Sequence, residues 1–341
     1  MEVELKDVAE ALEGVLLPQP KRSLPQLNMV RDIEVSGERV KLTLALTPLS
    51  VPERENVQER VRAAIEALPG VNDVAIELVE RSPQELNEFD RVVAVMSGKG
   101  GVGKSLVTAL LAIALTRQGY QVGILDADLT GPSIPKMFGL KTRPSGGEGG
   151  ILPVETRSGI EVMSLNLLLP HEDDAVIWRG PLLSQAITQF WQEVLWGKLD
   201  YLLLDLPPGT ADVPLTVMQS LPLSGVIIVS TPQDLAAMVV RKAVHMARKL
   251  GIHILGVVEN MSYLEIPETG KRIEIFGRSK GEEMAKEAEA PLLGQLPIDP
   301  QLAELCDAGE IERYNSDAFI ALSMAFTQAM PAYAHPLHDH D

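Results

Sequence analysis

Short apolar runs alternate with longer segments of helical spacing along most of the chain. The apolar runs are rich in β-branched side chains and are typical of buried strands. The first of them is followed by a glycine-rich loop and a helical segment, and the rhythm then repeats. Strands that alternate with helices predict an α/β fold with a doubly wound, mostly parallel sheet. The expected strands are residues 91–96, 121–125, 159–164, 201–204, 225–229 and 252–258, and the expected helices are residues 106–115, 182–196 and 235–250.

Residues 1–80 have a different pattern, which predicts a separate small α+β domain. Residues 81–90 are polar and include Pro83, so we expect a linker there, before the larger domain at 91–330. Residues 331–341 hold three of the six histidines; we expect a flexible tail, and weak binding of Zn²⁺ or Ni²⁺ is the alternative. The helices expected in the small domain are residues 7–17 and 53–68, and the strands are residues 40–46 and 71–79.

Composition narrows the class of protein. With 341 residues, 45% of them hydrophobic, the chain is long and apolar enough for a large globular core. A formal net charge of −17 argues against nucleic acid or an anionic membrane as a partner, because the mean field of the protein repels both. The single cysteine, Cys306, excludes an intramolecular disulfide and suits a reducing cytoplasm. We see no signal region and no apolar run that could cross a bilayer, so we expect a cytoplasmic protein.

A glycine-rich loop follows the first predicted strand of the larger domain. It fits G-x-x-x-x-G-K-[ST], the phosphate-binding loop, and a preceding strand and a following helix are the context that this motif requires. The glycines let backbone N–H groups turn inward around an anion, and the positive end of the helix adds to the attraction. We expect Lys104 to reach the β- and γ-phosphates of ATP and Ser105 to hold Mg²⁺. The residues of the loop are Gly98, Lys99, Gly100, Gly101, Val102, Gly103, Lys104 and Ser105.

A second lysine, Lys99, directly follows the first glycine of the loop. The simple phosphate-binding loop does not require it. The run G-K-G-G-V-G-K-S resembles the deviant Walker A loop of the MinD, ParA and nitrogenase iron protein class. That resemblance implies that Lys99 reaches across a dimer interface to the nucleotide of the partner. The alternative is a solvated loop lysine.

Carboxylates follow two other predicted strands. The strand at 121–125 leads into Asp126 and Asp128, and the strand at 201–204 leads into Asp205. Ligands bind outside the carboxyl ends of parallel strands, so we expect these side chains beside the loop. An apolar strand that ends in aspartate fits the Walker B pattern, which predicts Asp205 in the Mg²⁺ shell and Asp128 as the residue that positions or polarises the attacking water. Capping of the next helix or turn is the alternative, above all for Asp126.

Two glycine- and proline-rich segments, 130–135 and 206–212, follow these carboxylates. They resemble switch loops, whose conformation depends on the γ-phosphate, although rigid turns have the same composition. For adenine we predict contacts from Asn260, whose amide both donates and accepts hydrogen bonds, and from the backbone near Pro297. An asparagine after a strand is also a common turn former, which is the alternative.

Several segments taken together resemble the Mrp/ApbC/NBP35 family. The likeness covers residues 91 to about 325, and the N-terminal region is similar to the small MIP18-like domain that is often fused in front. The resemblance implies a dimeric ATPase that carries iron–sulfur clusters and transfers them to apoproteins, with ATP and Mg²⁺ as cofactors. The segments are S-G-K-G-G-V-G-K-S, D-A-D-L-T-G-P-S, W-R-G-P at 178–181, L-L-L-D-L-P-P-G-T-A-D, S-T-P-Q-D at 230–234 and V-V-E-N-M-S-Y.

The chain departs from this family at its cysteines. Family members usually follow E-N-M-S-Y with a Cys-x-x-Cys pair, and one pair from each subunit holds a bridging cluster. Here Ile266 and Thr269 occupy those positions, and neither can supply a thiolate to iron. In the small domain Ser50 stands where a cysteine is common, and Cys306 lies in an apolar helical setting that suits a core thiol. The ATPase motifs are thus complete, whereas the usual thiolate ligands are missing.

Two functions follow as hypotheses. The first is an ATP-hydrolysing homodimer that assists the assembly of iron–sulfur clusters or their transfer to apoproteins. The second is a cluster-free, ATP-dependent switch of the MinD or ParA type, which the missing cysteines favour. A small-molecule kinase would need an acceptor pocket, and the sequence points to none.

Overall fold

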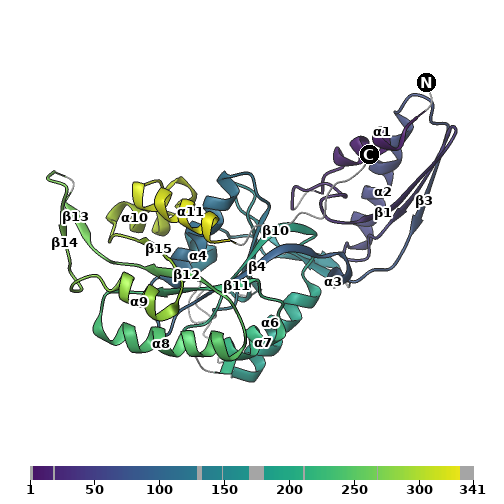
Figure 1. Ribbon diagram of the computed structural model, residues 1–341. Coiled ribbons are helices and arrows are strands. Elements are labelled where there is room, and N and C mark those ends of the chain that lie inside the picture. The colour runs from purple at the N-terminus through teal and green to yellow at the C-terminus, as the bar shows by residue number, and fades with distance from the viewer. Residues whose placement is uncertain are drawn as a thin grey trace.

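A computed structural model describes the chain as two parts, each built on its own sheet (Figure 1). The larger part has an eight-stranded sheet, and the smaller, N-terminal part has a three-stranded sheet. This architecture confirms the predicted fold class, a doubly wound α/β fold with a small α+β domain in front. The described residues are 3–17, 20–128, 133–147, 149–168, 180–209, 212–266 and 268–330.

The large sheet has the strand order β15-β12-β11-β4-β10-β5-β9-β8. Its described pairs are parallel except for β8–β9 at one edge, which is antiparallel. Strand β10 lies between β4 and β5, so the carboxyl ends of these three strands meet at one edge. The strands are β4 (Glu88–Met96), β5 (Val122–Asp126), β8 (Val154–Glu155), β9 (Glu161–Ser164), β10 (Lys198–Asp205), β11 (Gly225–Ser230), β12 (Ile254–Glu259) and β15 (Leu292–Gln295).

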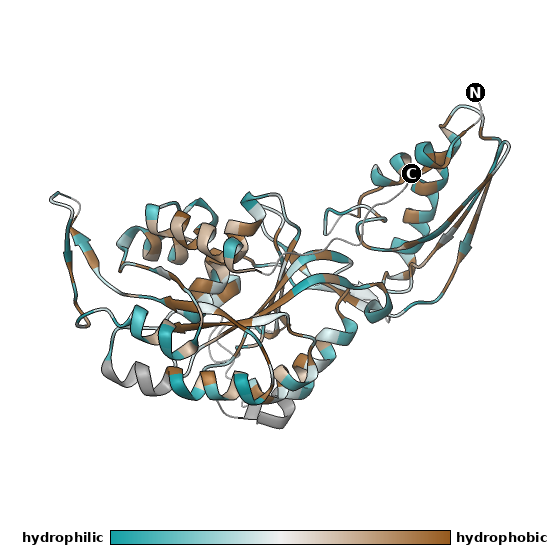
Figure 2. Cartoon of the chain, in the orientation of Figure 1, coloured by the Kyte–Doolittle hydropathy of each residue, from teal (hydrophilic) through white to brown (hydrophobic). Residues whose placement is uncertain are grey.

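Helices cover both faces of this sheet and bury a separate hydrophobic cluster on each (Figure 1). The strands are strongly hydrophobic and the outer helix surfaces are polar (Figure 2), as a sheet covered on both faces requires. One face carries α4 (Lys104–Arg117), α5 (Ser133–Met137), α10 (Pro300–Ala308) and α11 (Asp317–Ala329), and the other carries α6 (Gly180–Glu193), α7 (Asp212–Ser220), α8 (Asp234–Lys249) and α9 (Gly281–Ala288).

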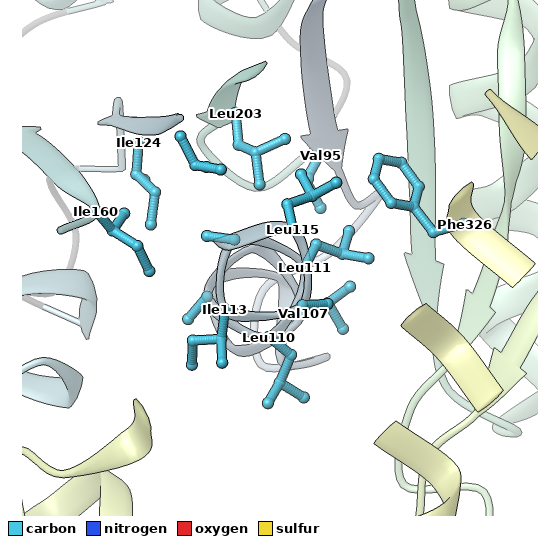
Figure 3. Packing of buried hydrophobic residues seen from close by; sticks show 14 of the residues in the cluster. Val95, Val107, Leu110, Leu111, Ile113, Leu115, Ile124, Ile160, Leu203 and Phe326 are labelled. Atoms are coloured by element: carbon cyan, nitrogen blue, oxygen red, sulfur yellow. The ribbon is translucent and has the colours of Figure 1, made fainter. Parts of the chain in front are cut away.

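Helix α4, which follows the glycine-rich loop, is buried on all sides. Every residue from Val107 to Leu115 is inaccessible to solvent or nearly so. Thr108 is the one polar residue among them. Figure 3 shows Leu111 and Leu115 among strand residues such as Val95 and Leu203. An apolar perimeter of this kind is typical of a helix inside a core. The loop at its N-terminus is therefore fixed to the rigid centre of the domain.

The small domain packs two helices on a mixed sheet of order β1-β2-β3. The pair β1–β2 is antiparallel, and β2–β3 is parallel. Ser50 begins the second helix through a capping box with Glu53, the N-terminal signature of S-x-x-E. The sequence pattern missed β1, and it placed the end of the first helix four residues too late, at 17 rather than at 13. The elements are α1 (Leu5–Glu13), β1 (Val30–Ser36), β2 (Arg39–Leu44), α2 (Val51–Glu66) and β3 (Asp73–Leu78).

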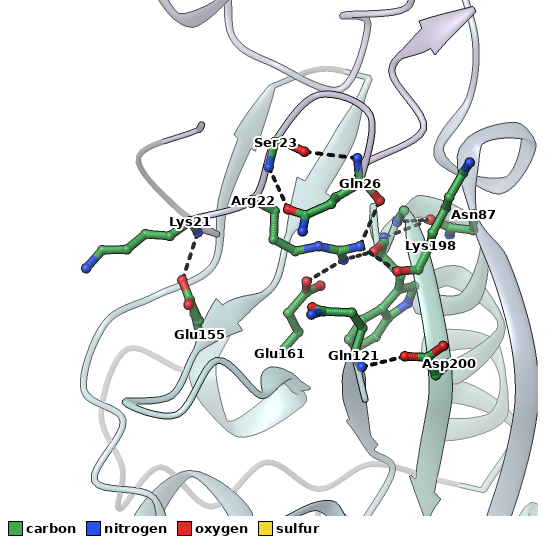
Figure 4. Close-up of polar contacts among 12 residues, drawn as sticks. Lys21, Arg22, Ser23, Gln26, Asn87, Gln121, Glu155, Glu161, Lys198 and Asp200 are labelled. Atoms are coloured by element: carbon green, nitrogen blue, oxygen red, sulfur yellow. Dashed lines mark hydrogen bonds and ion pairs between the residues drawn. The ribbon is translucent and has the colours of Figure 1, made fainter. Parts of the chain in front are cut away.

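The junction between the two parts is tightly packed. Helix α3 (Pro83–Leu86) and the first residues of β4 occupy the segment expected to be a linker. Leu152 and Leu195 of the large part belong to the hydrophobic core of the small domain. Arg22 enters from the small domain, and its Nη1 donates to Glu161 Oε1 at 2.6 Å, among further polar contacts (Figure 4). The two parts therefore share both apolar and charged contacts.

Short additional elements complete the chain. The pair β6 (Ser145–Gly147) and β7 (Gly150–Leu152) and the pair β13 (Leu264–Ile266) and β14 (Lys271–Ile273) form antiparallel ribbons. Two 3₁₀ turns, η1 (Leu165–Leu168) and η2 (Ile311–Arg313), precede α6 and α11. Among the described residues, no helix combines the length and the apolar composition needed to cross a membrane.

Candidate nucleotide site

The glycine-rich loop turns between β4 and α4, as the motif predicts. Gly101 and Gly103 have φ angles of +78° and +82°, in the left-handed region that glycine adopts at no steric cost. At Gly103 a Cβ atom would also lie 2.1 Å from Nδ2 of Asn260, so no larger residue fits there without a shift. Gly103 is therefore required both by its φ angle and by the space that Asn260 occupies.

A cavity of about 420 Å³ opens beside this loop. It is large enough for the phosphates of a nucleotide, and it lies outside the carboxyl ends of β4, β5 and β10, where ligands of parallel sheets bind. Its lining residues are Ser97, Gly100, Gly101, Val102, Gly103, Lys104, Ser105, Leu106, Asp128, Ser133, Met137, Pro208 and Met261.

Lys104 is the cation at the base of the cavity. Its side chain is 4% exposed, and its Nζ lies 2.7 Å from Asp205 Oδ1 and 3.4 Å from Asp128 Oδ2. The structure thus brings together the lysine and the two carboxylates that the sequence placed at separate strand ends. One ammonium is thus shared between two carboxylates at the place where a phosphate would enter.

Asp205 is fully buried and is held by hydroxyl groups as well as by Lys104. Ser105 Oγ donates to its Oδ2 at 2.5 Å, and Thr108 Oγ1 donates to its Oδ1 at 3.0 Å. Burial raises the pKa of the Asp205 carboxyl, while Lys104 and Ser105 oppose that shift. Thr108 was not among the predicted residues, although its position one helical turn after Lys104 places both side chains on one face of α4.

Asp126 stands behind the site. It pairs with Asp205 in the register of β5 and β10, and its side chain is 2% exposed. Its Oδ1 accepts the backbone N–H of Asp128, the turn-forming role considered from the sequence, and its Oδ2 accepts the Ser164 hydroxyl at 2.8 Å. Burial and the nearby Asp205 carboxylate raise the pKa of Asp126 well above its usual range. Ser164 was not predicted as a site residue, although it is a polar residue at the end of a predicted strand.

Lys99 lies on the outer side of the loop. Its Nζ donates to Gln233 Oε1 of the same chain at 2.5 Å, and it does not line the cavity. Within one chain, Lys99 therefore contacts Gln233 and not the cavity that Lys104 lines. Its expected contact with a partner's nucleotide remains a prediction.

The two residues predicted for adenine lie on the far side of the loop. Asn260 is 2% exposed, and its Nδ2 donates to the backbone carbonyl of Val102 at 2.9 Å. Pro297 is half-buried and follows β15. Neither residue lines the cavity, whereas Met261, the neighbour of Asn260, does. Adenine contacts by Asn260 and Pro297 remain predictions.

The predicted switch loops are only partly within the described chain. Residues 129–132 and 210–211 lie outside the described residues, as do residues 178–179 of the W-R-G-P segment and the tail at 331–341. Ser133 and Pro208, which belong to the two predicted switch segments, both line the cavity.

The positions at which the resemblance implies cysteines lie on the β13–β14 ribbon. Ile266 ends β13, and Thr269 lies in the turn before β14. Cys306 is far along the chain on α10, where burial raises the pKa of its thiol to about 11. Across the described ranges, no three His, Cys, Asp or Glu side chains gather in a way that could hold a metal ion. Neither Ile266, Thr269 nor Cys306 therefore offers a ready thiolate.

Comparison with known proteins identifies the family. Residues 88–330 match the model of the NUBPL iron-transfer P-loop NTPase family, and residues 5–78 match that of an iron–sulfur cluster assembly protein. An iron–sulfur cluster carrier protein of Synechocystis sp. is 40% identical, over 89% of each chain, and one of Aquifex aeolicus is 37% identical, over 96% of this chain and 98% of its own. A nucleotide-binding protein of Archaeoglobus fulgidus, solved in complex with ADP, is 46% identical with a TM-score of 0.62, over 72% of this chain and 94% of its own. With its intact phosphate-binding loop and paired carboxylates, the chain belongs to the NUBPL iron-transfer P-loop NTPase family.

Proposed function

We propose that the chain binds ATP in the 420 Å³ cavity and hydrolyses it in a Mg²⁺-dependent reaction. The observation that carries this proposal is the Lys104 ammonium, held 2.7 Å from Asp205 and 3.4 Å from Asp128 at the base of that cavity. A relative that is 46% identical was solved with ADP, which supports the same ligand here.

The residues present fit a Mg²⁺ ion. Ser105 Oγ and the Asp205 carboxylate supply oxygen ligands of the kind that Mg²⁺ prefers, and they already lie within hydrogen-bond distance of each other. When bound, Mg²⁺ would neutralise developing charge on the phosphate oxygens. Ser105 and Asp205 would hold it, and Asp205 would then exchange its contact with the Ser105 hydroxyl for one with the ion or its water.

The protein's own groups supply the rest of the reaction. Lys104 leaves the two carboxylates to pair with phosphate oxygens, because an incoming triphosphate carries more negative charge than either. Asp128 has 15% of its side chain exposed at the cavity wall, where it can orient a water molecule in line with the γ-phosphate. The backbone N–H groups of Gly100, Gly101 and Gly103, which line the cavity, would surround the phosphates.

We further propose that the active form is a homodimer in which Lys99 completes the site of the partner. Mixing two inactive variants tests this. Lys104→Ala cannot hold nucleotide, and Lys99→Ala binds nucleotide but lacks the residue for its partner's site. In a mixed dimer, the Lys99→Ala subunit keeps Lys104 and receives Lys99 from its partner, so one site of two is complete. Equal mixing should restore about a quarter of wild-type ATP turnover, since half of the dimers are mixed.

The outcome of mixing separates the two geometries. If Lys99 acts within its own chain, the mixture stays as inactive as its components, and the dimeric mechanism is wrong. Unchanged turnover in Lys99→Ala alone would contradict any role for this lysine. Gln233→Ala, which frees Lys99 from its contact in the same chain, serves as a control that keeps both lysines.

For the biological role we propose that the protein assists the assembly of iron–sulfur clusters or their transfer to apoproteins. The support comes from relatives that are named iron–sulfur cluster carrier proteins and that match this chain over most of its length and of their own. The residues present do not fit a cluster bound in the family's usual way, because Ile266 and Thr269 stand where the cysteines are expected, and burial raises the pKa of the Cys306 thiol to about 11. The cluster would then be cargo held together with a partner protein.

The second candidate, a cluster-free ATP switch, is favoured by the same missing cysteines. Anaerobic reconstitution with iron and sulfide separates the two, alone and with an apo iron–sulfur protein present. A stoichiometric charge-transfer absorbance, or faster cluster gain by the apoprotein in the presence of ATP, supports the carrier. Neither signal, together with intact ATP turnover, supports the switch. Under either role, we propose two units at 1–80 and 91–330 joined by 81–90, working in the reducing cytoplasm.

A further inference from the structure

The β13–β14 ribbon belongs to an arm that projects from the large domain. We define the arm as the described residues of 263–277; Figure 1 shows it extending away from the sheet beside α9 and α10. Its second half is exposed from Lys271 to Gly277, with Ile275 50% and Phe276 36% exposed. Near its base the arm is also held by Ile298, whose backbone N–H donates to Tyr263 O at 2.7 Å and which bridges Leu264.

The two ends of the arm, which we call its feet, attach to one buried carboxylate. Glu259, the last residue of β12, is 0% exposed. Its Oε2 accepts the hydroxyl of Ser262 at 2.5 Å, just before the arm, and the hydroxyl of Ser279 at 2.6 Å, just after it. Its Oε1 accepts the backbone N–H of Lys280 at 2.7 Å. The entry and the exit of the arm are thereby fixed to the same side chain.

The core side of the same carboxylate is also occupied. Gln295, at the end of β15, donates its Nε2 to Glu259 Oε2 at 3.2 Å and to Ser279 Oγ at 2.5 Å. A buried carboxylate is costly unless donors surround it, and here four donors from three segments do so. Such a set of partners holds the base of the arm against the edge of the sheet.

The residue after Glu259 contacts the phosphate-binding loop. Asn260 donates its Nδ2 to the carbonyl of Val102, and its backbone N–H bonds to Ser230 O at 2.8 Å on β11. Its side chain also fills the space over Gly103. Two consecutive residues at the end of β12 therefore hold the arm on one side and the phosphate-binding loop on the other.

We propose that Glu259 is a positioning residue that couples the orientation of the arm to nucleotide in the phosphate-binding loop. This inference rests on the proposed binding of adenine nucleotide. A shift of the loop around phosphate moves Val102 and Asn260, and Asn260 carries Glu259 and both feet of the arm with it. Glu259 thus links both ends of the arm to the strand that ends at the phosphate-binding loop, and the arm presents Ile275 and Phe276 at a different angle when the site is filled.

Trypsin cleavage of the full-length protein after Lys271 and Arg272 reports on the arm, because both residues are exposed on β14. Saturating Mg·ADP should change the cleavage rate of the wild type by about 5-fold or more, the lower end of typical coupling between sites. In Glu259→Ala the rate should rise without nucleotide and no longer respond to Mg·ADP. Glu259→Gln keeps the shape of the side chain and one acceptor oxygen, but its amide nitrogen cannot accept the Lys280 N–H, so it should retain only part of the response.

Glu265→Ala is the matched control. Glu265 lies on the arm and pairs with Arg272 at 3.0 Å on the surface, so its loss changes the arm but not its base. This variant should keep the response to Mg·ADP. If Glu259→Ala does not fold, Ser279→Ala replaces it. This variant removes the hydrogen bond from one end of the arm to Glu259, so the response to Mg·ADP should be reduced but not lost.

Each remaining result counts against a stated claim. Wild type that binds Mg·ADP in calorimetry but is cleaved at an unchanged rate overturns the coupling and leaves the proposed function intact. A full response in Glu259→Ala or in Ser279→Ala overturns the role of Glu259. Wild type that binds no Mg·ADP at all contradicts the proposed function, and this inference with it.

Discussion

Within the described part of the chain, two basic side chains are buried against carboxylates, and their surroundings differ. Lys104 and Asp205 meet at the nucleotide site, whereas Arg22 and Glu161 meet at the junction of the two parts. Each pair is nearly inaccessible to solvent. At the nucleotide site, hydroxyls of Ser105 and Thr108 satisfy the remaining carboxylate positions. At the junction, Arg22 Nε and Glu161 Oε2 have no hydrogen-bond partner, and neither has Trp196 Nε1 nearby.

The difference shows what each pair is for. A pair whose lysine lines a cavity, and whose carboxylate has hydroxyl partners as well, can exchange one partner for a phosphate. At the junction, Arg22 also donates from Nη1 and Nη2 to the backbone carbonyls of Gln26, Trp196 and Lys198. Those carbonyls fix where the small domain sits against β10. The Lys104–Asp205 pair can thus exchange a partner for phosphate, whereas the Arg22–Glu161 pair fixes the position of the small domain.

The largest effect should come from breaking the pair at the nucleotide site. Lys104→Ala removes the cation that meets the β- and γ-phosphates, and we expect the affinity for Mg·ATP to fall by at least about 100-fold, equivalent to losing two strong charge-assisted hydrogen bonds. Isothermal titration calorimetry measures this. Lys141→Ala, which removes an exposed lysine, is the control and should bind as the wild type does.

Breaking the junction pair should act on stability instead of binding. Arg22→Met leaves Glu161 buried without its cation, which costs about 3–5 kcal/mol in comparable pairs. The loss should appear as faster hydrogen exchange at the amides of Trp196 and Gly197, which donate to Asn87 Oδ1 at the junction. Lys21→Met removes the neighbouring exposed charge and should leave exchange unchanged. Normal exchange in Arg22→Met would mean that the pair does not hold the junction.

The junction pair also predicts a pH dependence. Burial raises the pKa of Glu161 from 4.5 to about 7, although Arg22 opposes the shift. The folded state then binds the proton that the unfolded state has already released, so the contribution of Glu161 to stability is full below pH 4.5 and is lost as the pH rises to about 7. Across that window the loss is about 3 kcal/mol.

Glu161→Gln isolates this contribution. The difference in unfolding free energy between wild type and variant, from denaturant titrations at pH 5 to 8, should shift in favour of the variant as the pH rises. Glu155, half-buried on β8, is the other carboxylate that affects Glu161, and Glu155→Gln should keep most of the slope. A difference independent of pH would contradict the raised pKa.

The same contrast explains what the sequence could reveal. The phosphate-binding loop, Asp128 and Asp205 were predictable, because a local motif and the ends of apolar strands identify them without knowledge of packing. Arg22 and Glu161 are 139 residues apart and belong to no motif, so only the folded chain brings them together. Glu259 directly follows the strand predicted at 252–258, but nothing local shows that Ser279 and Gln295 will contact it. The β13–β14 ribbon was likewise missed, since its strands are three residues long.

The smallest effect should come from removing both charges at the junction together. Arg22→Met with Glu161→Leu leaves no buried charge unpaired, and apolar replacement of a whole buried pair is often neutral or stabilising. The carbonyls of Trp196 and Lys198 lose their donor, so we expect a net cost of about 2 kcal/mol or less, below that of Arg22→Met alone. Hydrogen exchange at Trp196 and Gly197 in the double variant should lie between that of Arg22→Met and the wild type. If the double variant is as unstable as Arg22→Met, the guanidinium's bonds to the backbone hold the junction, and its pairing with Glu161 contributes nothing.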